Sequence, residues 1–460
     1  MCGVFGIRSE ERDVSRLAYF GLFALQHRGQ ESAGIAVSDG GRLTVLREMG
    51  LVAHVFNEQQ LQALPGEVAI GHTRYSTTGA NRWANAQPLV HHGRARTVAL
   101  GHNGNLVNVE ELRAELVEDG IRLASGSDSE IIAALIARDP APLLEAAGNA
   151  MSRLEGAYSV TALSEGALVA FRDPLGFRPL TLGRIGTDWV VASETSALDL
   201  IGADVVRDVR PGEIVRVDAD GLRTVQAAPA GKNALCIFEH VYFARPDSRV
   251  AGVEVHGARV RMGERLAREA PAEADLVIGI PDSGTPAAIG FSKASGIPFN
   301  EALIKNRYVA RTFIQPEQGM REQGIKLKFN PLDEVEGKRI VVVEDSIVRG
   351  TTTRQIVSML FDAGAREVHM RVASPPIVSP CFYGMDFGDD EQLLAAHRSV
   401  EEMRALIGAT SLHYLSVEAM QEATQLPEDA VCRACFTRDY PTRVPGSRKL
   451  EKLRFEAAPA

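Results

Sequence analysis

The sequence predicts two domains of different fold class: an α+β domain comes first, and an α/β domain built on a parallel sheet follows it. The chain has 460 residues, which is more than one hydrophobic core usually serves. To about residue 228 it consists of short apolar runs separated by glycines, whereas from about residue 275 it repeats strand, loop and helix. The segment 227–231 (Ala-Ala-Pro-Ala-Gly) is the predicted linker. We therefore assign residues 2–228 to the first domain and residues 229–460 to the second.

Composition and charge limit the classes of protein to which this chain can belong. Apolar residues make up 45% of it and charged residues 24%, as in folded globular proteins. The formal net charge of −9 argues against a nucleic-acid-binding protein, whose binding surface is basic. No run of the sequence approaches the ~20 apolar residues of a membrane span, and the N-terminus lacks a signal-peptide pattern. We expect a cytoplasmic protein with neither a nucleic-acid partner nor a membrane partner.

The first domain is predicted to contain antiparallel sheets with helices beside them. Its short apolar runs are bounded by turn-forming residues, which is typical of strands, and longer periodic stretches indicate helices. The expected strands are 67–71, 97–101, 159–163, 168–172 and 189–193, and the expected helices are 13–25, 129–138 and 141–154.

The second domain is predicted to form a doubly wound parallel sheet, because strands alternate with helices along the chain. The first two predicted strands each lead into a glycine-containing loop and then into a helix. The expected strands are 276–280, 339–343 and 368–373, the loops are 281–285 and 345–350, and the helices are 286–295 and 351–363.

The N-terminus carries a candidate nucleophile, Cys2. Removal of Met1 is favoured before a small residue, and it would leave Cys2 with a free α-amino group. The pKa of such an amine is about 8. It can therefore accept a proton near neutral pH and act as the base for its own thiol. Position alone favours the alternative, a cysteine that merely follows the start codon, so other residues must decide.

Polar groups at the ends of predicted strands supply the other parts that acyl transfer from an amide requires. Asn103 offers a side-chain amide and Gly104 a backbone N–H, which together suit an oxyanion hole. Arg74 can hold a carboxylate as a planar fork. Asp128 can pair with an ammonium group, although it also fits the N-cap of the following helix.

Together these residues resemble the glutaminase domain of the class II, N-terminal-nucleophile amidotransferases. The similarity covers roughly the first 225 residues and implies an α+β fold of four layers. It implies that Cys2 is the nucleophile, that Asn103 and Gly104 form the oxyanion hole, that Arg74 and Asp128 contact glutamine, and that Arg28 supports the site. The matching segments are 26–30 (Gln-His-Arg-Gly-Gln), 71–77 (Gly-His-Thr-Arg-Tyr-Ser-Thr), 101–106 (Gly-His-Asn-Gly-Asn-Leu) and 127–130 (Ser-Asp-Ser-Glu).

The second domain contains a candidate phosphate site in the segment 340–352 (Ile-Val-Val-Val-Glu-Asp-Ser-Ile-Val-Arg-Gly-Thr-Thr). An apolar strand ends in Glu344 and Asp345, and the loop that follows closes at a helix N-terminus. Free backbone N–H groups there, with the hydroxyls of Ser346 and Thr351, form a cradle for a monophosphate. The carboxylates can hold ribose hydroxyls directly or through magnesium. An acidic turn would explain an Asp-Ser pair alone, but not the whole string.

This segment resembles the signature of type I phosphoribosyltransferases, in which many relatives have Asp where this chain has Glu344. The resemblance implies a magnesium site at Ser283, Glu344 and Asp345, and a pyrophosphate loop at 281–285. It also implies a lid within 305–328, although each lid cation fits ordinary surface charge as well. The predicted contacts to phosphoribosyl pyrophosphate are Lys305, Arg307, Lys326, Glu344, Asp345, Ser346, Arg349, Gly350 and Thr351.

Four cysteines form a separate candidate site: Cys236, Cys381, Cys432 and Cys435. The last two make a Cys-x-x-Cys pair, which also suits zinc or redox chemistry, and four buried free thiols are a further alternative. One group of the enzymes that this chain resembles carries a [4Fe–4S] cluster on cysteines in this arrangement. The resemblance implies such a cluster here, with a structural or oxygen-sensing role.

The order of the two domains resembles enzymes that transfer ammonia from glutamine to phosphoribosyl pyrophosphate. That reaction gives phosphoribosylamine, glutamate and pyrophosphate, and it is the first committed step of purine biosynthesis. Ammonia would cross between the sites as the neutral amine, past the segment 238–248. The resemblance also implies inhibition by purine nucleotides and a homotetramer.

Two alternatives from other classes remain open. The first is an amidotransferase that makes a glucosamine phosphate, which would need sugar-isomerase domains in place of the segment 343–352. The second is a non-catalytic regulator that binds nucleotides on a phosphoribosyltransferase fold. That alternative leaves Cys2, Asn103 and Asp128 without a purpose.

Overall fold

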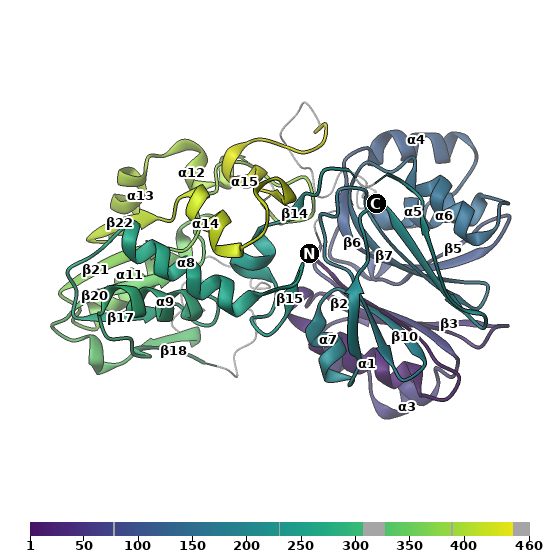
Figure 1. Ribbon diagram of the computed structural model, residues 1–460, viewed down its shortest axis with the longest axis horizontal. Coiled ribbons are helices and arrows are strands. Elements are labelled where there is room, and N and C mark those ends of the chain that lie inside the picture. Colours follow the sequence, from purple (N-terminus) through teal and green to yellow (C-terminus); the bar gives the residue numbers. More distant parts are fainter. Residues whose placement is uncertain (77–78, 230, 307–326, 388–389, 445–460) are drawn as a thin grey trace.

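The chain folds into two lobes that meet near its N-terminus (Figure 1). The computed structural model describes residues 1–460 apart from 77–78, 230, 307–326, 388–389 and 445–460. The first lobe extends to about residue 226, and the second lobe follows it along the chain. In the stretches so described, no helix is long and apolar enough to cross a membrane.

The first lobe contains two antiparallel sheets packed face to face, with helices on both outer surfaces. The seven-stranded sheet has the order β11-β9-β10-β1-β4-β2-β3, and the six-stranded sheet has the order β13-β12-β8-β7-β6-β5. The strands are β1 (Gly3–Arg8), β2 (Ser32–Ser38), β3 (Leu43–Met49), β4 (Val68–Arg74), β5 (Leu89–His92), β6 (Thr97–Leu106), β7 (Gly156–Ser164), β8 (Ala167–Arg172), β9 (Thr181–Ile185), β10 (Asp188–Ala192), β11 (Asp204–Asp208), β12 (Glu213–Asp218) and β13 (Gly221–Gln226). The helices are α1 (Val14–Ala24), η1 (Gln26–Arg28), α2 (Val52–Val55), α3 (Glu58–Gln62), η2 (Trp83–Asn85), α4 (Val109–Glu118), α5 (Asp128–Arg138), α6 (Leu143–Met151) and α7 (Thr195–Leu200).

Alternating side chains on the strands create the four layers of this lobe. On β1, Phe5 points to the core under α1, whereas its neighbour Val4 points to the core between the two sheets. On β6, Ala99 lies in that same central core, whereas Leu100 packs with the α5 and α6 side of the lobe. Successive side chains of a strand point to opposite faces, so both sheets are buried on both faces. The predicted four-layer α+β fold is confirmed.

The second lobe is a doubly wound α/β unit, as predicted. Its parallel sheet has the order β17-β20-β21-β22. On β20, Val341 and Val343 face the core that contains α8 and α9, whereas Ile340 and Val342 face the core that contains α11 and α13. The elements of this lobe are β14 (Leu235–Cys236), η3 (Glu239–Phe243), β15 (Arg249–Val250), β16 (Val253–Glu254), α8 (Val255–Glu269), β17 (Leu276–Gly279), α9 (Thr285–Ser295), β18 (Leu303–Lys305), β19 (Phe329–Pro331), η4 (Asp333–Val335), β20 (Arg339–Glu344), α11 (Thr351–Asp362), β21 (Glu367–Val372), η5 (Asp390–Gln392), α12 (Leu394–His397), α13 (Val400–Ile407), β22 (Ser411–Tyr414), α14 (Val417–Thr424), η6 (Glu428–Ala430), β23 (Val431–Cys432) and α15 (Ala434–Thr437).

The backbone stays attached to the first lobe at the end of the segment 227–231 and after it. The N–H of Gly231 donates to the carbonyl oxygen of Pro174 at 2.9 Å, and the N–H of Cys236 donates to that of Phe177 at 3.0 Å. Cys236 then pairs with Cys432 in the short parallel ladder between β14 and β23. The crossing between the lobes is therefore a hydrogen-bonded strand that leads directly to one of the four candidate thiols.

Candidate active site between the two lobes

Cys2 is buried just before β1, and Figure 1 places the N-terminus where the two lobes meet. Its backbone N–H donates a hydrogen bond to Oδ1 of Asn103 at 3.0 Å. Its thiol donates to the carbonyl oxygen of Tyr75, with an Sγ–O distance of 3.6 Å. Its own carbonyl oxygen accepts a hydrogen bond from Nε of Arg28 at 2.9 Å. Three separate segments of the first lobe therefore fix the position of this cysteine.

Met1 precedes Cys2 and is itself buried. Burial lowers the pKa of the Met1 amino group to about 5, against the opposing charge of the Cys2 thiolate. While Met1 is attached, the Cys2 nitrogen is an amide and cannot act as a base. Removal of Met1 would convert this nitrogen, which Asn103 holds, into the free amine that an N-terminal nucleophile requires.

Asn103 and Gly104 lie together on β6, beside Cys2. In the part of the chain that the structure describes, Nδ2 of Asn103 is buried without a hydrogen-bond partner. Because a buried unpaired donor is unfavourable, this N–H is suited to a ligand oxygen. Gly104 has φ +152°, and a Cβ there would lie 2.0 Å from the carbonyl oxygen of Ala157, so only glycine fits. Asn103 thus offers an unpaired buried donor beside Cys2, next to a backbone position that requires glycine.

Arg74 is held at the end of β4 by acceptors around it. Its Nη1 donates to Oε2 of Glu31 at 3.3 Å and to the carbonyl oxygen of Ala80 at 3.2 Å. Glu31 also accepts hydrogen bonds from the N–H and the hydroxyl of Ser76. The guanidinium group is therefore fixed by Glu31 and Ala80, and Arg74 directly precedes Tyr75, whose carbonyl oxygen contacts the Cys2 thiol. Sequence reasoning did not identify Glu31, which lies one position beyond the segment 26–30.

Asp128 opens α5 but does not cap it. The N-cap is Ser127, whose hydroxyl accepts from the N–H of Ser129, so the alternative reading of Asp128 as a cap is wrong. Its Oδ2 instead accepts from the N–H of Leu106 at 3.0 Å, at the end of β6. Burial alone would raise the pKa of this carboxyl, but the charge of His102 and these hydrogen bonds hold it below its ordinary value. Asp128 therefore carries a negative charge near the proposed oxyanion hole.

Arg28 lies at the centre of a fully buried ionic network that joins the two lobes. It pairs with Glu194 of the first lobe, and its Nη2 donates to Oε1 of Glu239, in the second lobe, at 2.8 Å. Burial alone would lower the pKa of Arg28, but the two carboxylates raise it well above its ordinary value. Since Arg28 also binds the Cys2 carbonyl oxygen, one charged side chain links Cys2 to the second lobe.

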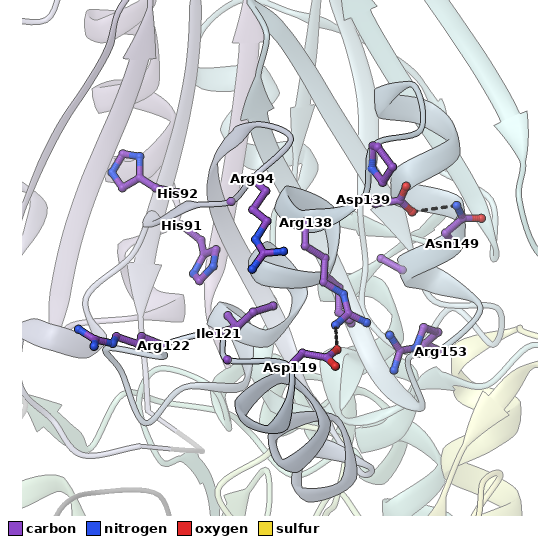
Figure 2. Close-up of a pocket in the computed structure, with 15 residues that line it drawn as sticks. His91, His92, Arg94, Asp119, Ile121, Arg122, Arg138, Asp139, Asn149 and Arg153 are labelled. Atoms are coloured by element: carbon purple, nitrogen blue, oxygen red, sulfur yellow. Dashed lines mark hydrogen bonds and ion pairs between the residues drawn. The ribbon is translucent and has the colours of Figure 1, made fainter.

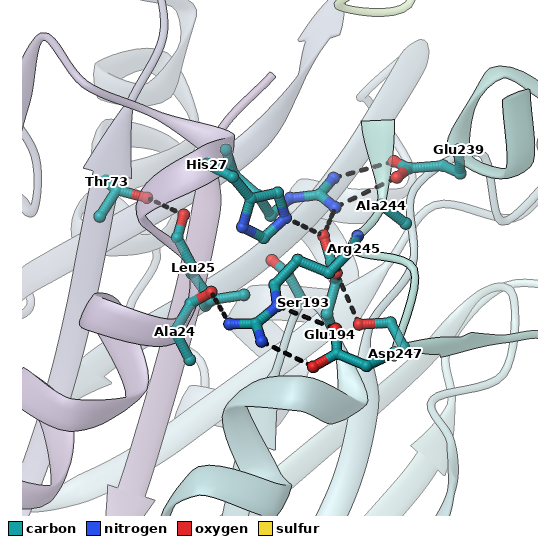
Figure 3. Close-up of polar contacts among 12 residues, drawn as sticks. Ala24, Leu25, His27, Thr73, Ser193, Glu194, Glu239, Ala244, Arg245 and Asp247 are labelled. Carbon is teal, nitrogen blue, oxygen red and sulfur yellow. Dashed lines mark hydrogen bonds and ion pairs between the residues drawn. The ribbon is translucent and has the colours of Figure 1, made fainter. Parts of the chain in front are cut away.

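Glu194 has further hydrogen-bond partners besides Arg28. His27 contacts its Oε1 at 2.7 Å, and the N–H of Arg245 donates to its Oε2 at 2.9 Å (Figure 3). The hydroxyl of Ser248 donates to the same Oε2 at 2.7 Å. Burial alone would raise the pKa of Glu194, but His27 and Arg28 lower it well below its ordinary value. Neither Glu194 nor Glu239 was predicted, because no local pattern distinguishes them from other acidic residues.

The paired carboxylates of the second lobe lie at the carboxyl end of β20, as predicted. The hydroxyls of Ser283 and Ser346 each donate to Asp345 at 2.5 Å. Burial, and then the charge of Asp345, raises the pKa of Glu344 well above its ordinary value. Burial likewise raises the pKa of Asp345, against the lowering effect of its hydrogen bonds to the two serines. Two adjacent buried carboxylates are unfavourable when both are charged, and a bound cation would remove this repulsion.

The loop between β20 and α11 is partly exposed. Ile347 is buried in the core, whereas Arg349 and Thr351 are exposed. Gly350 is the N-cap of α11 and has φ +72°, and a Cβ there would lie 2.7 Å from Cδ2 of Leu394. Because the first N–H groups of a helix have no partner within the helix, the start of α11 is suited to bind an anion.

Lys305 forms an ion pair with Asp282, which lies in the predicted pyrophosphate loop. This contact joins the end of β18 to the loop that carries Ser283. Two other predicted contacts, Arg307 and Lys326, lie outside the described residues. Lys328 lies over the ring of Phe329, with its Nζ 5.3 Å from the ring centroid.

The four cysteines other than Cys2 come together from three parts of the chain. Cys236 and Cys432 face each other in the β14–β23 ladder, and every cysteine is a free thiol. Burial, and then the charges of the other three thiols, raises the pKa of Cys435 well above its ordinary value. Within the described residues, no group of three or more His, Cys, Asp or Glu side chains is arranged to hold a single metal ion.

A cavity of about 790 Å³ opens elsewhere on the first lobe, at the ends of α4, α5 and α6 (Figure 2). Arg138 points across it to Asp119, and Asn149 contacts Asp139. The cavity contains neither Cys2 nor the paired carboxylates. It is therefore separate from the residues that carry the chemistry described above.

The four-layer lobe with Cys2 at its first strand, joined to an α/β lobe with a phosphate-type loop, defines a glutamine amidotransferase coupled to a phosphoribosyltransferase unit. Residues 72–200 match the family of the glutamine amidotransferase domain. The amidophosphoribosyltransferase of Mycobacterium tuberculosis (strain H37Rv) is 52% identical over 99% of this chain and 89% of the relative. That of Synechococcus elongatus is 53% identical over 100% of this chain and 95% of the relative.

Solved structures agree over almost the whole chain. The glutamine phosphoribosylpyrophosphate amidotransferase of B. subtilis, in complex with ADP and GMP, is 45% identical, with a TM-score of 0.91 over 97% of this chain and 98% of that one. A structure described as the allosteric regulatory enzyme of purine biosynthesis is also 45% identical, with a TM-score of 0.92 over 98% of both chains. The chain belongs to the amidophosphoribosyltransferase family. It is an enzyme that transfers ammonia from glutamine to phosphoribosyl pyrophosphate, at the start of purine biosynthesis, and this prediction is confirmed.

Proposed function

We propose that Cys2, once Met1 is removed, is the nucleophile that releases ammonia from glutamine. The α-amine accepts the thiol proton, and the thiolate attacks the carboxamide carbon of the substrate. The oxygen of that group becomes an oxyanion, which Nδ2 of Asn103 and the N–H of Gly104 stabilise. Ammonia leaves as the thioester forms, and water then releases glutamate. The observation that carries this proposal is the 3.0 Å contact of Cys2 with Asn103, whose Nδ2 lacks any partner among the described residues.

Arg74 and Asp128 are proposed to hold the two charged ends of glutamine. The guanidinium of Arg74 would bind the α-carboxylate, and the buried carboxylate of Asp128 would bind the α-ammonium group. Their positions support this, since Arg74 adjoins Tyr75, which contacts the Cys2 thiol, and Asp128 contacts the end of the strand that bears Asn103. Arg28 is proposed to fix the Cys2 backbone.

The second lobe is proposed to hold phosphoribosyl pyrophosphate at the carboxyl edge of its parallel sheet. The N-terminus of α11, with Ser346, Arg349, Gly350 and Thr351, would bind the monophosphate. Glu344 and Asp345 would hold the ribose hydroxyls, and Lys305, Arg307 and Lys326 the pyrophosphate. Ammonia then attacks the anomeric carbon, and pyrophosphate leaves with the electrons of the broken C–O bond.

Magnesium is the proposed cofactor of this site, with Ser283, Glu344 and Asp345 as the residues that would hold it. The oxygen donors and the raised pKa values of the two carboxyls fit a hard cation. When bound, magnesium would offset the charge of the leaving pyrophosphate. The protein's own part is to hold the two carboxylates in place, which the hydroxyls of Ser283 and Ser346 do through Asp345.

A [4Fe–4S] cluster is proposed at Cys236, Cys381, Cys432 and Cys435. Four free thiols that influence one another electrostatically are a suitable donor set. Ligands of a cluster stand farther apart than ligands of one ion, because the iron–sulfur core separates them. That no three or more His, Cys, Asp or Glu side chains of the described residues are arranged around one ion is therefore compatible with this proposal.

Purine nucleotides are proposed as inhibitors, since their monophosphate would fit the cradle at α11. The B. subtilis relative in complex with ADP and GMP supports nucleotide binding in this family. A homotetramer is proposed on the resemblance alone.

The roles in the first lobe are tested by Cys2→Ala. The expected result is loss of glutamine-dependent pyrophosphate release, by at least ~10⁴-fold, with ammonia-dependent release retained. The measurement is the release of pyrophosphate from phosphoribosyl pyrophosphate by anaerobically purified protein. It is made with magnesium and with either glutamine or ammonia as the donor. Glutamine use by the Cys2→Ala protein would overturn the assignment of the nucleophile. Loss of both activities together would mean that Cys2 is required for the fold.

A further inference from the structure

Residues 381–386 (Cys-Phe-Tyr-Gly-Met-Asp) belong to the second lobe but lie against the glutaminase site of the first. Nδ2 of Asn105 donates to the carbonyl oxygen of Phe382 at 3.1 Å. Asn105 comes directly after Gly104, so this bond fixes the strand end that carries the proposed oxyanion hole. The 381–386 segment thus contacts the residue that follows Gly104 in the chain.

Close backbone packing adds to this hydrogen bond. Gly384 is buried with φ +103°, and a Cβ on it would lie 3.1 Å from both the carbonyl carbon and the carbonyl oxygen of Gly104. Backbone atoms cannot move aside as the end of a flexible side chain can. Gly384 therefore allows the second lobe to touch the backbone of the proposed oxyanion hole directly.

The segment also reaches the nucleophile through Tyr75. The Tyr75 hydroxyl donates to Oδ2 of Asp386 at 3.1 Å, while the Tyr75 carbonyl oxygen accepts from the Cys2 thiol. In addition, Nε of Arg178 donates to the carbonyl oxygen of Tyr383 at 2.9 Å. Contacts to both the nucleophile side and the oxyanion side thus come from one short stretch of the second lobe.

The base of the segment is anchored within the second lobe, independently of the glutaminase. The N–H groups of Val378 and Ser379 both donate to the carbonyl oxygen of Cys435, at 2.9 and 3.2 Å. The Tyr440 hydroxyl donates to the carbonyl oxygen of Pro380 at 2.7 Å. The residues that precede the segment are therefore hydrogen-bonded to Cys435 and Tyr440 of the second lobe, whereas the segment itself contacts the first lobe.

From these contacts we infer that the 381–386 segment is a positioning element of the glutaminase, which holds Gly104 and Tyr75 in the geometry for attack on glutamine. Its residues act through Gly104, Asn105 and Tyr75 and need not touch either substrate. The inference rests on the proposed roles of Cys2, Asn103 and Gly104. It predicts that damage to this part of the second lobe impairs glutamine use, although the second lobe itself uses ammonia.

The test compares Gly384→Ala with a matched control, Gly364→Ala. Gly364 lies in the turn after α11 and also has a positive φ (+89°). A Cβ there would also have its nearest contact at 3.1 Å, but with the side chain of Glu336 in the second lobe. We expect Gly384→Ala to lower kcat with glutamine by about tenfold or more, with less than a twofold change in KM for glutamine. Ammonia-dependent kcat should stay within twofold of the parent value. Gly364→Ala should leave the ratio of the two activities unchanged.

A second pair keeps the inference testable if Gly384→Ala fails to fold. Asp386→Ala removes the acceptor of the Tyr75 hydroxyl and should lower only glutamine-dependent kcat, whereas Asp386→Asn retains an acceptor oxygen and should restore it. Equal losses with glutamine and with ammonia, or unchanged glutamine use in both Gly384→Ala and Asp386→Ala, would overturn the inference. Because Cys2→Ala is assayed alongside, failure of the nucleophile assignment is distinguishable: glutamine use would then persist in Cys2→Ala itself.

Discussion

At the scale of single residues, the buried charged side chains around Cys2 form ion pairs in which opposite charges offset one another. Arg28 has two carboxylate partners, and each lobe supplies one of them. A buried charge that loses its partner is strongly destabilising, whereas an intact pair contributes little net stability. The network around Arg28 therefore serves chiefly to fix geometry, and disruption of it is expected to affect both stability and the position of Cys2.

Glu194→Gln is expected to destabilise the protein by about 3 kcal/mol at neutral pH, because Arg28 and His27 lose a charged partner. The folded state holds the pKa of Glu194 below its ordinary value of 4.5. Its contribution is therefore fully present above about pH 4.5 and is lost as the pH falls below that value. Urea midpoints of parent and variant from pH 3.5 to 7 should differ most at neutral pH and converge in acid.

The control for this prediction is Glu401→Gln, which removes an exposed partner of Arg404 on α13. Exposed ion pairs contribute little, so this variant should follow the parent at every pH. A Glu194→Gln protein as stable as the parent at pH 7 would show that the buried network does not depend on this charge.

At the scale of elements, the start of α11 depends on the backbone conformation of one glycine. An alanine at Gly350 would have to adopt φ +72° and would also meet the Leu394 side chain at 2.7 Å. The left-handed conformation alone costs about 1 kcal/mol or more for a residue with a Cβ. Gly350→Ala is therefore expected to shift the loop and weaken the N–H cradle.

The expected outcome for Gly350→Ala is a rise of about tenfold in KM for phosphoribosyl pyrophosphate, measured with ammonia as the donor so that the glutaminase plays no part. Gly296→Ala provides the comparison, since Gly296 has φ +77° at the end of α9 with open space around its Cβ position. It should lose similar stability without a change in KM. An unchanged KM in Gly350→Ala would exclude the start of α11 as the phosphate site.

At the scale of the whole molecule, local patterns in the sequence predicted some of the elements but not the contacts between lobes. The strand that ends in Glu344 and the helix that follows it were found from apolar runs and loop chemistry. Helix α8 was missed, because its buried face includes Arg259 and its exposed positions are strongly charged. The link between Arg28 and Glu239 spans 211 positions, and no spacing rule connects residues so far apart. The contact between Gly384 and Gly104 is invisible for the same reason.

The proposed cluster makes a prediction for the fold as a whole, because its four cysteines come from three distant parts of the chain. Without a metal, burial raises the pKa of Cys236 to about 11, so this thiol is neutral and a metal must displace its proton. Since a ligand that binds only the folded state stabilises it, loss of the cluster should lower the melting temperature of the whole chain.

Anaerobically purified protein is therefore expected to be brown, with about four irons per chain and no zinc. Cys435→Ser should lose iron, colour and thermal stability together, whereas Cys2→Ala, which removes the one cysteine outside the group, should retain all three. A colourless anaerobic protein that contains zinc, or no metal, would contradict the proposal. It would leave four free thiols, two buried and two half-buried, that pack as small apolar side chains, and Cys435→Ser would then change stability only slightly.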